Sequence, residues 1–115
     1  MLPKEHRLKT NYDFRKVKQH GNAVHTTYFT LLYYVPKNKK SVPSRFGFIA
    51  SKKFDKRAVV RNRARRLLRE VIREHLDTIN SGYDIVLIAK NNIKNAKYQE
   101  VNSAFNKILP KVPFA

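Results

Sequence analysis

Residues 45–76 read RFGFIASKKFDKRAVVRNRARRLLREVIREHL, a strand pattern that runs directly into a helix pattern. Over residues 45–51 a period of two places Phe46, Phe48 and Ala50 on one face of a strand and Gly47, Ile49 and Ser51 on the other. From about residue 57 to 76, apolar side chains recur at helical spacing, at Val60, Ala64, Leu67, Leu68 and Val71. This stretch therefore predicts a strand followed by a long amphipathic helix.

A second strand is predicted after this helix. Ser81 and Gly82 end the helical segment, and residues 83–89 are apolar except for Asp84, as expected of a strand that is covered on both faces. Two strands separated by a long helix are joined by a crossover, which makes them a parallel pair. The unit from residue 45 to 89 therefore predicts a sheet packed against helices.

The residues before this unit predict a short helix and a strand. Thr10 and Asn11 offer a helix cap, and Gly21 ends the helical segment. Residues 28–35 are aromatic and aliphatic and are predicted to form a strand, which residues 22–26 either extend or bend into.

A loop and a last helix complete the pattern. Residues 37–44, with Pro36 and Pro43 at the margins, are predicted to form the loop, and Tyr98 to Leu109 keep helical spacing until Pro110. The predicted fold class is α+β, a small mixed sheet with helices in a two-layer α/β sandwich, in the order α-β-β(-β)-α-β-α. The 115 residues fit a single RNA-binding domain, 1–115, in which residues 1–9 form a basic N-terminal arm.

Charge and cysteine content narrow the classes of function. Lys+Arg 25 against Asp+Glu 8 gives a formal net charge of +17, which indicates a polyanionic partner. With no cysteine, disulfides, thiolate metal sites and cysteine nucleophiles are excluded. The chain opens without an apolar signal core and has no apolar run of the ~20 residues that span a bilayer. We therefore expect a cytoplasmic protein with no membrane partner, and no obligate protein partner is evident from the sequence.

The arginines gather at the start of the long helix, where backbone N–H groups already make the environment positive. A cation there is unfavourable by roughly 0.3–1 kcal/mol, so such a run indicates a large polyanion against the helix. Arginine matches phosphate with a planar fork of donors and stacks on bases, which favours shaped RNA.

A helical projection divides these arginines between two flanks. The apolar positions fall within about 60° of Ala64 and must face the sheet. One flank carries Arg61, Arg65 and Arg69; the other carries Arg63 and Arg66, with Asn62 and Arg73 near the solvent side. Glu70 occurs only in the later turns, where it can pair with Arg66 or Arg73. One helix can thus present basic surface in two directions.

No catalytic residue and no metal site are predicted in the protein itself. The histidines at 6, 20, 25 and 75 have no metal-ligand spacing, and the aspartates are isolated. Asp55 is better interpreted as a helix cap or first-turn residue than as a magnesium ligand. The carboxylate pair that two-metal phosphodiester hydrolysis requires is absent from the pattern. Mg²⁺, if used, is expected to be held mainly by RNA phosphates.

The motifs of the chain resemble the family of bacterial ribonuclease P proteins. That family is marked by a lysine pair after a strand and a helix with Arg-Asn-Arg, which here are Ser51-Lys52-Lys53 and Arg61-Asn62-Arg63-Ala64-Arg65-Arg66-Leu67-Leu68-Arg69. The similarity extends through Arg7-Leu8-Lys9, Asp13-Phe14-Arg15-Lys16-Val17, His20-Gly21 and the strand at 83–90.

The resemblance implies a ribonucleoprotein enzyme that removes the 5′ leader from precursor tRNA. In it the RNA subunit is catalytic, and the protein binds the leader and the RNA subunit and lowers the magnesium requirement. The implied partners are the catalytic RNA subunit and precursor tRNA. The resemblance also implies a βαβ crossover of the rare left-handed kind.

Site residues are implied by the same resemblance. Lining the leader cleft would be Phe14, Lys18, Thr30, Leu32, Arg61, Arg65 and Arg69. Facing the RNA subunit would be Lys52, Lys53, Arg57, Asn62, Arg63 and Arg66. Lys18 and Leu32 stand where aromatic residues are common in the family, which predicts weaker base stacking and stronger charge contacts. Phe14 could alternatively be a core residue, because many helical aromatics at this spacing simply pack.

Two other functions are compatible with the charge. A structural RNA-binding protein of the ribosomal type would explain the basic surface but predicts no effect of leader length on tRNA affinity. A stand-alone protein nuclease would cleave without an RNA subunit.

Overall fold

The computed structural model describes residues 2–36 and 43–114, and its helices and strands follow the predicted order. The α-helices are α1 (Asn11–His20), α2 (Ala58–His75) and α3 (Tyr98–Ile108), and the strands are β1 (Asn22–His25), β2 (Phe29–Tyr34), β3 (Arg45–Ile49) and β4 (Asp84–Ala89). Short 3₁₀ turns are η1 (Lys4–His6), η2 (Leu76–Thr78), η3 (Asn91–Asn95) and η4 (Leu109–Lys111). Most of the predicted loop at 37–44 lies outside the described residues.

The described strands form one mixed sheet in the order β1-β2-β4-β3. β3 and β4 pair in parallel, as the strand–helix–strand pattern predicted, and β2 pairs antiparallel with both β1 and β4. Residues 22–26 do not extend β2; their first four residues are the separate strand β1. The Thr26 hydroxyl accepts hydrogen bonds from the Tyr28 and Phe29 amides, which closes the turn between the two strands. The handedness of the β3-α2-β4 crossover stays a prediction.

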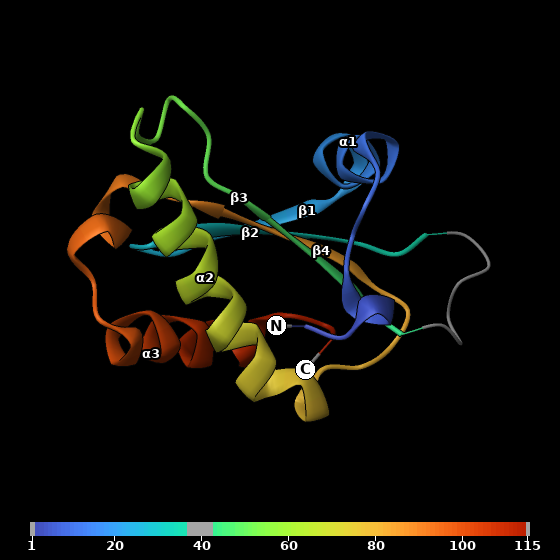
Figure 1. Cartoon of the computed structure of the whole chain (residues 1–115). Coiled ribbons are helices and arrows are strands. Elements are labelled where there is room, and N and C mark those ends of the chain that lie inside the picture. The colour runs from blue at the N-terminus through green and yellow to red at the C-terminus, as the bar shows by residue number, and fades with distance from the viewer. Residues whose placement is uncertain (1, 37–42, 115) are drawn as a thin grey trace.

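Helices cover both faces of the sheet (Figure 1). On one face α2 and α3 enclose the main core, to which the sheet contributes side chains such as Phe29, Leu31, Phe46, Ile85 and Leu87. On the other face α1 packs over a smaller cluster centred on Leu8, Val17 and Val86. The predicted period of two is thus confirmed in β3, where Phe46 and Phe48 enter the main core and Ile49 the smaller cluster, and β4 is covered on both faces as predicted. The α+β class is confirmed, with α1 on the face opposite the two longer helices.

The short first helix is bounded by the residues that the sequence indicated. The Thr10 side chain accepts a hydrogen bond from the Asp13 amide at 3.1 Å and caps the N-terminus. Gly21 follows the last turn, and its amide donates to the Val17 carbonyl at 2.8 Å. A β-carbon at Gly21 would overlap that carbonyl oxygen, which explains why glycine stands here.

The N-terminal arm is packed against the sheet. Leu2 is 2% exposed within the main core, whereas Leu8 is buried in the cluster beneath α1. Between them the Leu8 amide donates to the Phe46 carbonyl at 2.9 Å, and Arg7 forms an isolated parallel bridge with Phe46. The arm therefore passes along the edge of β3 and places one leucine on each side of the sheet.

Candidate nucleic-acid interface

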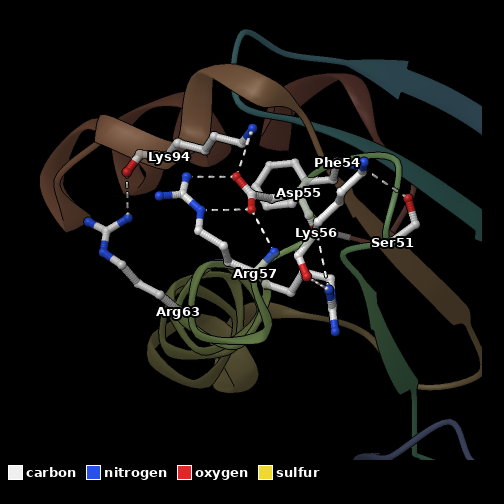
Figure 2. Close-up of polar contacts among 8 residues, drawn as sticks. Ser51, Phe54, Asp55, Lys56, Arg57, Arg63 and Lys94 are labelled. Carbon is white, nitrogen blue, oxygen red and sulfur yellow. Dashed lines mark hydrogen bonds and ion pairs between the residues drawn. The ribbon is translucent and has the colours of Figure 1, made fainter.

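The segment before α2 is organised by the carboxylate of Asp55 (Figure 2). Asp55 accepts hydrogen bonds from the Arg57 amide at 2.8 Å and from Arg57 Nε and Nη2 at 3.0 and 2.9 Å. Its Oδ2 also lies 3.2 Å from Lys94 Nζ. These hydrogen bonds, chiefly from the Arg57 side chain, hold the pKa of Asp55 well below its usual range.

Asp55 does not cap α2 in the expected way. The N-cap position is Arg57, whose side chain makes no capping hydrogen bond, and the first turn contains no acidic residue. Asp55 lies two residues earlier and orders the turn that leads into the helix. The unfavourable concentration of cations at the helix start, inferred from sequence, is therefore present in the structure with a single carboxylate beside it.

One flank of α2 faces β3 and the preceding segment. Arg61 Nη1 donates to the carbonyls of Asp55 and Lys56 at 3.1 and 2.8 Å, and Arg65 Nη1 donates to the Ala50 carbonyl at 3.1 Å. The Arg69 guanidinium lies over the Phe48 ring, 5.7 Å from its centroid. All three arginines of this flank are half-buried. Backbone carbonyls thus orient the guanidinium groups of Arg61 and Arg65, and the Phe48 ring orients that of Arg69.

The other flank of α2, with Arg63 and Arg66, is more exposed, and these two arginines differ in the contacts that they make. Arg63 donates to the carbonyls of Ile93, Lys94 and Ala96, at 3.4, 3.1 and 2.8 Å, so it joins α2 to η3. Arg66 is exposed and has no ion pair among the described residues. Arg63 thus has a structural role that the sequence did not indicate, while Arg66 is available to an external anion.

Further basic groups lie exposed near the start of α2. Lys52, Lys53 and Arg57 border a shallow cavity of about 860 Å³ together with Asp55 and Lys56. Asn62 is also exposed, and its side-chain oxygen accepts a hydrogen bond from Arg65. Asn62 therefore contacts the flank opposite to the one that the resemblance implied. Glu70 pairs with Arg73 at 2.8 Å, one of its two predicted partners, and this hydrogen bond lowers the pKa of Glu70.

Phe14 and Arg69 meet at a cavity of about 310 Å³ at the edge of β3. The Phe14 ring lies directly above Gly47, where a β-carbon would overlap it. Phe14 is half-buried, so it both packs in the smaller cluster and lines the cavity. The remaining lining residues are Leu2, Arg7, Leu8, Phe46, Gly47 and Phe48.

Three further residues implied for the leader cleft, Lys18, Thr30 and Leu32, lie on the same face of the sheet as α1 but outside this cavity, whereas Arg61 and Arg65 belong to α2, which packs on the opposite face. Leu32 is half-buried in the smaller cluster, and the Thr30 hydroxyl lies 3.2 Å from His25 Nδ1. Lys18 is exposed on α1. In Figure 1, α1 and the segment before α2 both rise above the strands, whereas α3 lies below them. The assignment of these residues to a leader site stays a prediction.

Sequence reasoning missed three parts of this region. The arm residues Arg7 and Leu8 line the cavity, but nothing in a short basic N-terminus indicates a docked segment. Lys94 approaches Asp55 from a turn that is distant in sequence. Arg45 forms ion pairs with Asp13 and Asp84, and only the lone acidic residue in the apolar strand β4 hinted at a buried partner.

Three of the described aspartates are paired with cations. Asp13 and Asp84 pair with Arg45, and Asp55 pairs with Arg57 and Lys94. In the part of the chain that the structure describes, no three His, Asp or Glu side chains gather closely enough to hold a metal ion. Across residues 2–36 and 43–114, no helix is both long and apolar enough to cross a membrane.

Comparison with known proteins agrees with this geometry. The Ribonuclease P family model matches residues 2–113. The ribonuclease P protein component of Fusobacterium nucleatum is 42% identical over 105 residues, which cover 88% of this chain and 91% of that protein. That of Clostridioides difficile is 40% identical over 105 residues, with 90% and 89% covered.

Solved structures show the same fold. The Staphylococcus aureus RNase P protein superimposes with a TM-score of 0.81 at 27% identity, over 96% of this chain and 98% of that one. The RNase P protein from Thermotoga maritima gives a TM-score of 0.77 at 25% identity, over 92% and 96%. With its two-flanked arginine helix, its mixed sheet and these relatives, the chain belongs to the ribonuclease P protein family.

Proposed function

We propose that this chain is the protein subunit of a ribonucleoprotein that removes the 5′ leader from precursor tRNA, with the RNA subunit performing the chemistry. The observation that carries the proposal is the division of α2. Arg69 shares a cavity with Phe14 on one flank, whereas Arg66 is exposed on the other. One helix can therefore contact two RNA molecules at once.

The leader would lie on the α1 face of the sheet. Single-stranded RNA binds by stacking its bases on aromatic or apolar side chains while cations follow its phosphates. Phe14 and Leu32 supply apolar surface there, Thr30 a hydroxyl and Lys18 a cation. In this proposal the leader phosphates would be followed by Arg61, Arg65 and Arg69, whose guanidinium groups are already oriented by backbone carbonyls or by the Phe48 ring.

The RNA subunit would contact the start and outer flank of α2. Lys52, Lys53, Arg57 and Arg66 are exposed cations, and Asp55 is the carboxylate that borders the same cavity as the first three. Asn62 and Arg63 belong to this surface as well, although Arg63 has part of its guanidinium bonded to η3. A polyanion bound here would remove the repulsion that these charges create within the free protein.

In the same proposal Mg²⁺ is held by RNA phosphates. The donors among the described residues do not fit a magnesium site, because no three His, Asp or Glu side chains gather there and Asp13, Asp55 and Asp84 are already paired with cations. The protein would lower the magnesium requirement by supplying positive charge where the two RNAs approach each other.

The test is binding of precursor and mature tRNA to the RNA subunit reconstituted with this chain. We expect tighter binding of the precursor, and affinity that rises with leader length. Turnover at low Mg²⁺ should require the protein. Equal affinity for precursor and mature tRNA would contradict a leader site, and cleavage by the nuclease-treated protein alone would contradict catalysis by RNA.

A matched pair of variants separates the two surfaces. Arg65→Ala should weaken the preference for precursor over mature tRNA, whereas Arg66→Ala should mainly weaken assembly with the RNA subunit. Both substitutions remove one arginine from adjacent positions of the same helix, so each controls for the other. Identical binding profiles would contradict the division of α2.

A further inference from the structure

The helix α1 is held to the sheet by few apolar contacts. Within α1, whose residues are all described, only Val17 is fully buried, and Phe14 is half-buried. Its other positions are mostly charged or polar. Such a helix needs further contacts to set its orientation, because a narrow apolar stripe leaves it free to pivot on the sheet.

Arg45 supplies a polar contact that joins α1 to two strands. Its Nε and Nη2 donate to the two carboxylate oxygens of Asp84, at 2.9 and 2.7 Å, and its Nη1 donates to Asp13 Oδ2 at 3.2 Å. The Asp84 side chain is 5% exposed, that of Asp13 18% and that of Arg45 24%. The bidentate pair with Asp84 orients the planar guanidinium, so the remaining nitrogen is aimed at α1.

The Asp13–Arg45 ion pair and the contact of Phe14 with Gly47 join adjacent positions of α1 to nearby positions of β3. Asp13 and Phe14 are adjacent in α1, and Arg45 and Gly47 are two residues apart, so they lie on the same face of β3. Asp13 meets Arg45, and Phe14 rests on Gly47. The start of α1 is therefore attached to β3 at two adjacent points, one ionic and one apolar, and the position of the Phe14 ring depends on both.

We propose that Arg45 is a positioning residue for the leader site. By holding Asp13 it ties the start of α1 to β3, and with it the Phe14 ring that shares a cavity with Arg69. Asp84 acts one step further away, by orienting Arg45. This inference rests on the proposed leader site and adds residues that act on it through α1.

The test variant is Asp13→Asn, which leaves the Arg45–Asp84 pair in place. We expect about fivefold weaker binding of precursor tRNA with a full leader, the size of effect that a partly buried ion pair of roughly 1 kcal/mol would have. Affinity for mature tRNA and for the RNA subunit should stay within about twofold. Asp13→Glu keeps the charge and should retain most of the affinity.

The sign of the effect distinguishes positioning from bulk charge. Removing a carboxylate from a protein that binds a polyanion should by itself strengthen binding. Asp77→Asn makes the same charge change at an exposed residue of η2 that has no ion pair among the described residues. It should leave leader affinity unchanged or slightly higher, whereas Asp13→Asn lowers it.

A double-mutant cycle with Phe14→Leu tests whether Asp13 acts through Phe14. If the ion pair positions the ring, Asp13→Asn should cost less leader affinity in the Phe14→Leu background than in the unaltered chain. Additive losses would overturn the inference. So would unchanged leader affinity of Asp13→Asn, or an equal loss of affinity for mature tRNA and the RNA subunit, which would indicate a general loss of fold. Absence of any leader effect in the unaltered chain would instead contradict the proposed function itself, and with it this inference.

Discussion

The Phe14 ring occupies the space that a β-carbon on Gly47 would fill. The Phe14 ring can therefore pack directly against the backbone of β3, because Gly47 has no side chain. This contact joins α1, which packs mainly over β2 and β4, to the edge strand β3, and the ring lines the cavity that Arg69 also lines.

Gly47→Ala is expected to displace Phe14. The added methyl group would force the ring or the whole helix to move, at a cost of roughly 1–3 kcal/mol in the free energy of unfolding. Leader affinity should fall as well, measured as the ratio of precursor to mature tRNA binding. Combining Gly47→Ala with Phe14→Leu should recover part of the lost stability, because a smaller side chain leaves room for the methyl group; no recovery would contradict the steric explanation.

We expect substitution of Arg63 to change the stability of the fold and substitution of Arg66 to change affinity for the RNA subunit. Arg63→Gln removes hydrogen bonds to the η3 carbonyls and should lower the free energy of unfolding by about 1–3 kcal/mol. Arg66→Gln should change stability by less than about 0.5 kcal/mol. It should instead reduce the slope of log affinity for the RNA subunit against log salt by about 1, the loss of one phosphate contact. Equal stability of both variants in urea titrations would contradict a structural role of Arg63.

Asp55 is expected to stabilise the segment before α2 over a defined pH range. Arg57 lowers the folded-state pKa of Asp55 from its ordinary value of 3.8, so the carboxylate contributes stability above that value. The contribution should be lost as the pH falls below it. Melting temperatures of the unaltered chain and Asp55→Asn should therefore differ by a constant amount above about pH 5 and converge in more acidic solution. A gap that persists at low pH would show that the charge is not its cause; Asp77→Asn is the control.

The N-terminal arm is expected to contribute to the core. Leu2→Ala should lower the free energy of unfolding by about 2–5 kcal/mol, since Leu2 is 2% exposed in the main core. Val59→Ala truncates an apolar side chain that is 78% exposed and should have an effect within about 0.5 kcal/mol. Urea unfolding of both variants checks this contrast. A dispensable arm would leave the two variants equally stable.

Local patterns predicted most of the backbone. The cap at Thr10, the glycine at the end of α1 and the helical spacing of α2 and α3 are short-range signals, and the structure places these elements within a few residues of the predictions. Residues 22–26 were ambiguous because a hairpin partner and a strand extension have the same local composition. The pairing of β1 with β2 settled this.

The candidate site was predictable in its chemistry and less so in its contacts. The spacing of arginines along one helix determines on which flank each lies, and the structure keeps that division, with the Arg61 flank half-buried and Arg66 exposed. The spacing of the arginines does not reveal which residues or ligands each flank contacts. Arg63 was assigned to an RNA contact, yet its guanidinium binds carbonyls some thirty residues away in sequence.

The sequence by itself determined the charge, the positions of the helices and strands, and the two-sided arrangement of cations on α2, since these depend on residues that are near one another in the chain. Only the tertiary structure decided that Phe14 rests on Gly47, that Arg45 joins Asp13 to Asp84, and that the arm completes the edge of β3. Each of these contacts joins segments that are distant in sequence and that the docking of α1 and the pairing of β3 with β4 bring together. Local propensity carries no information about such partners.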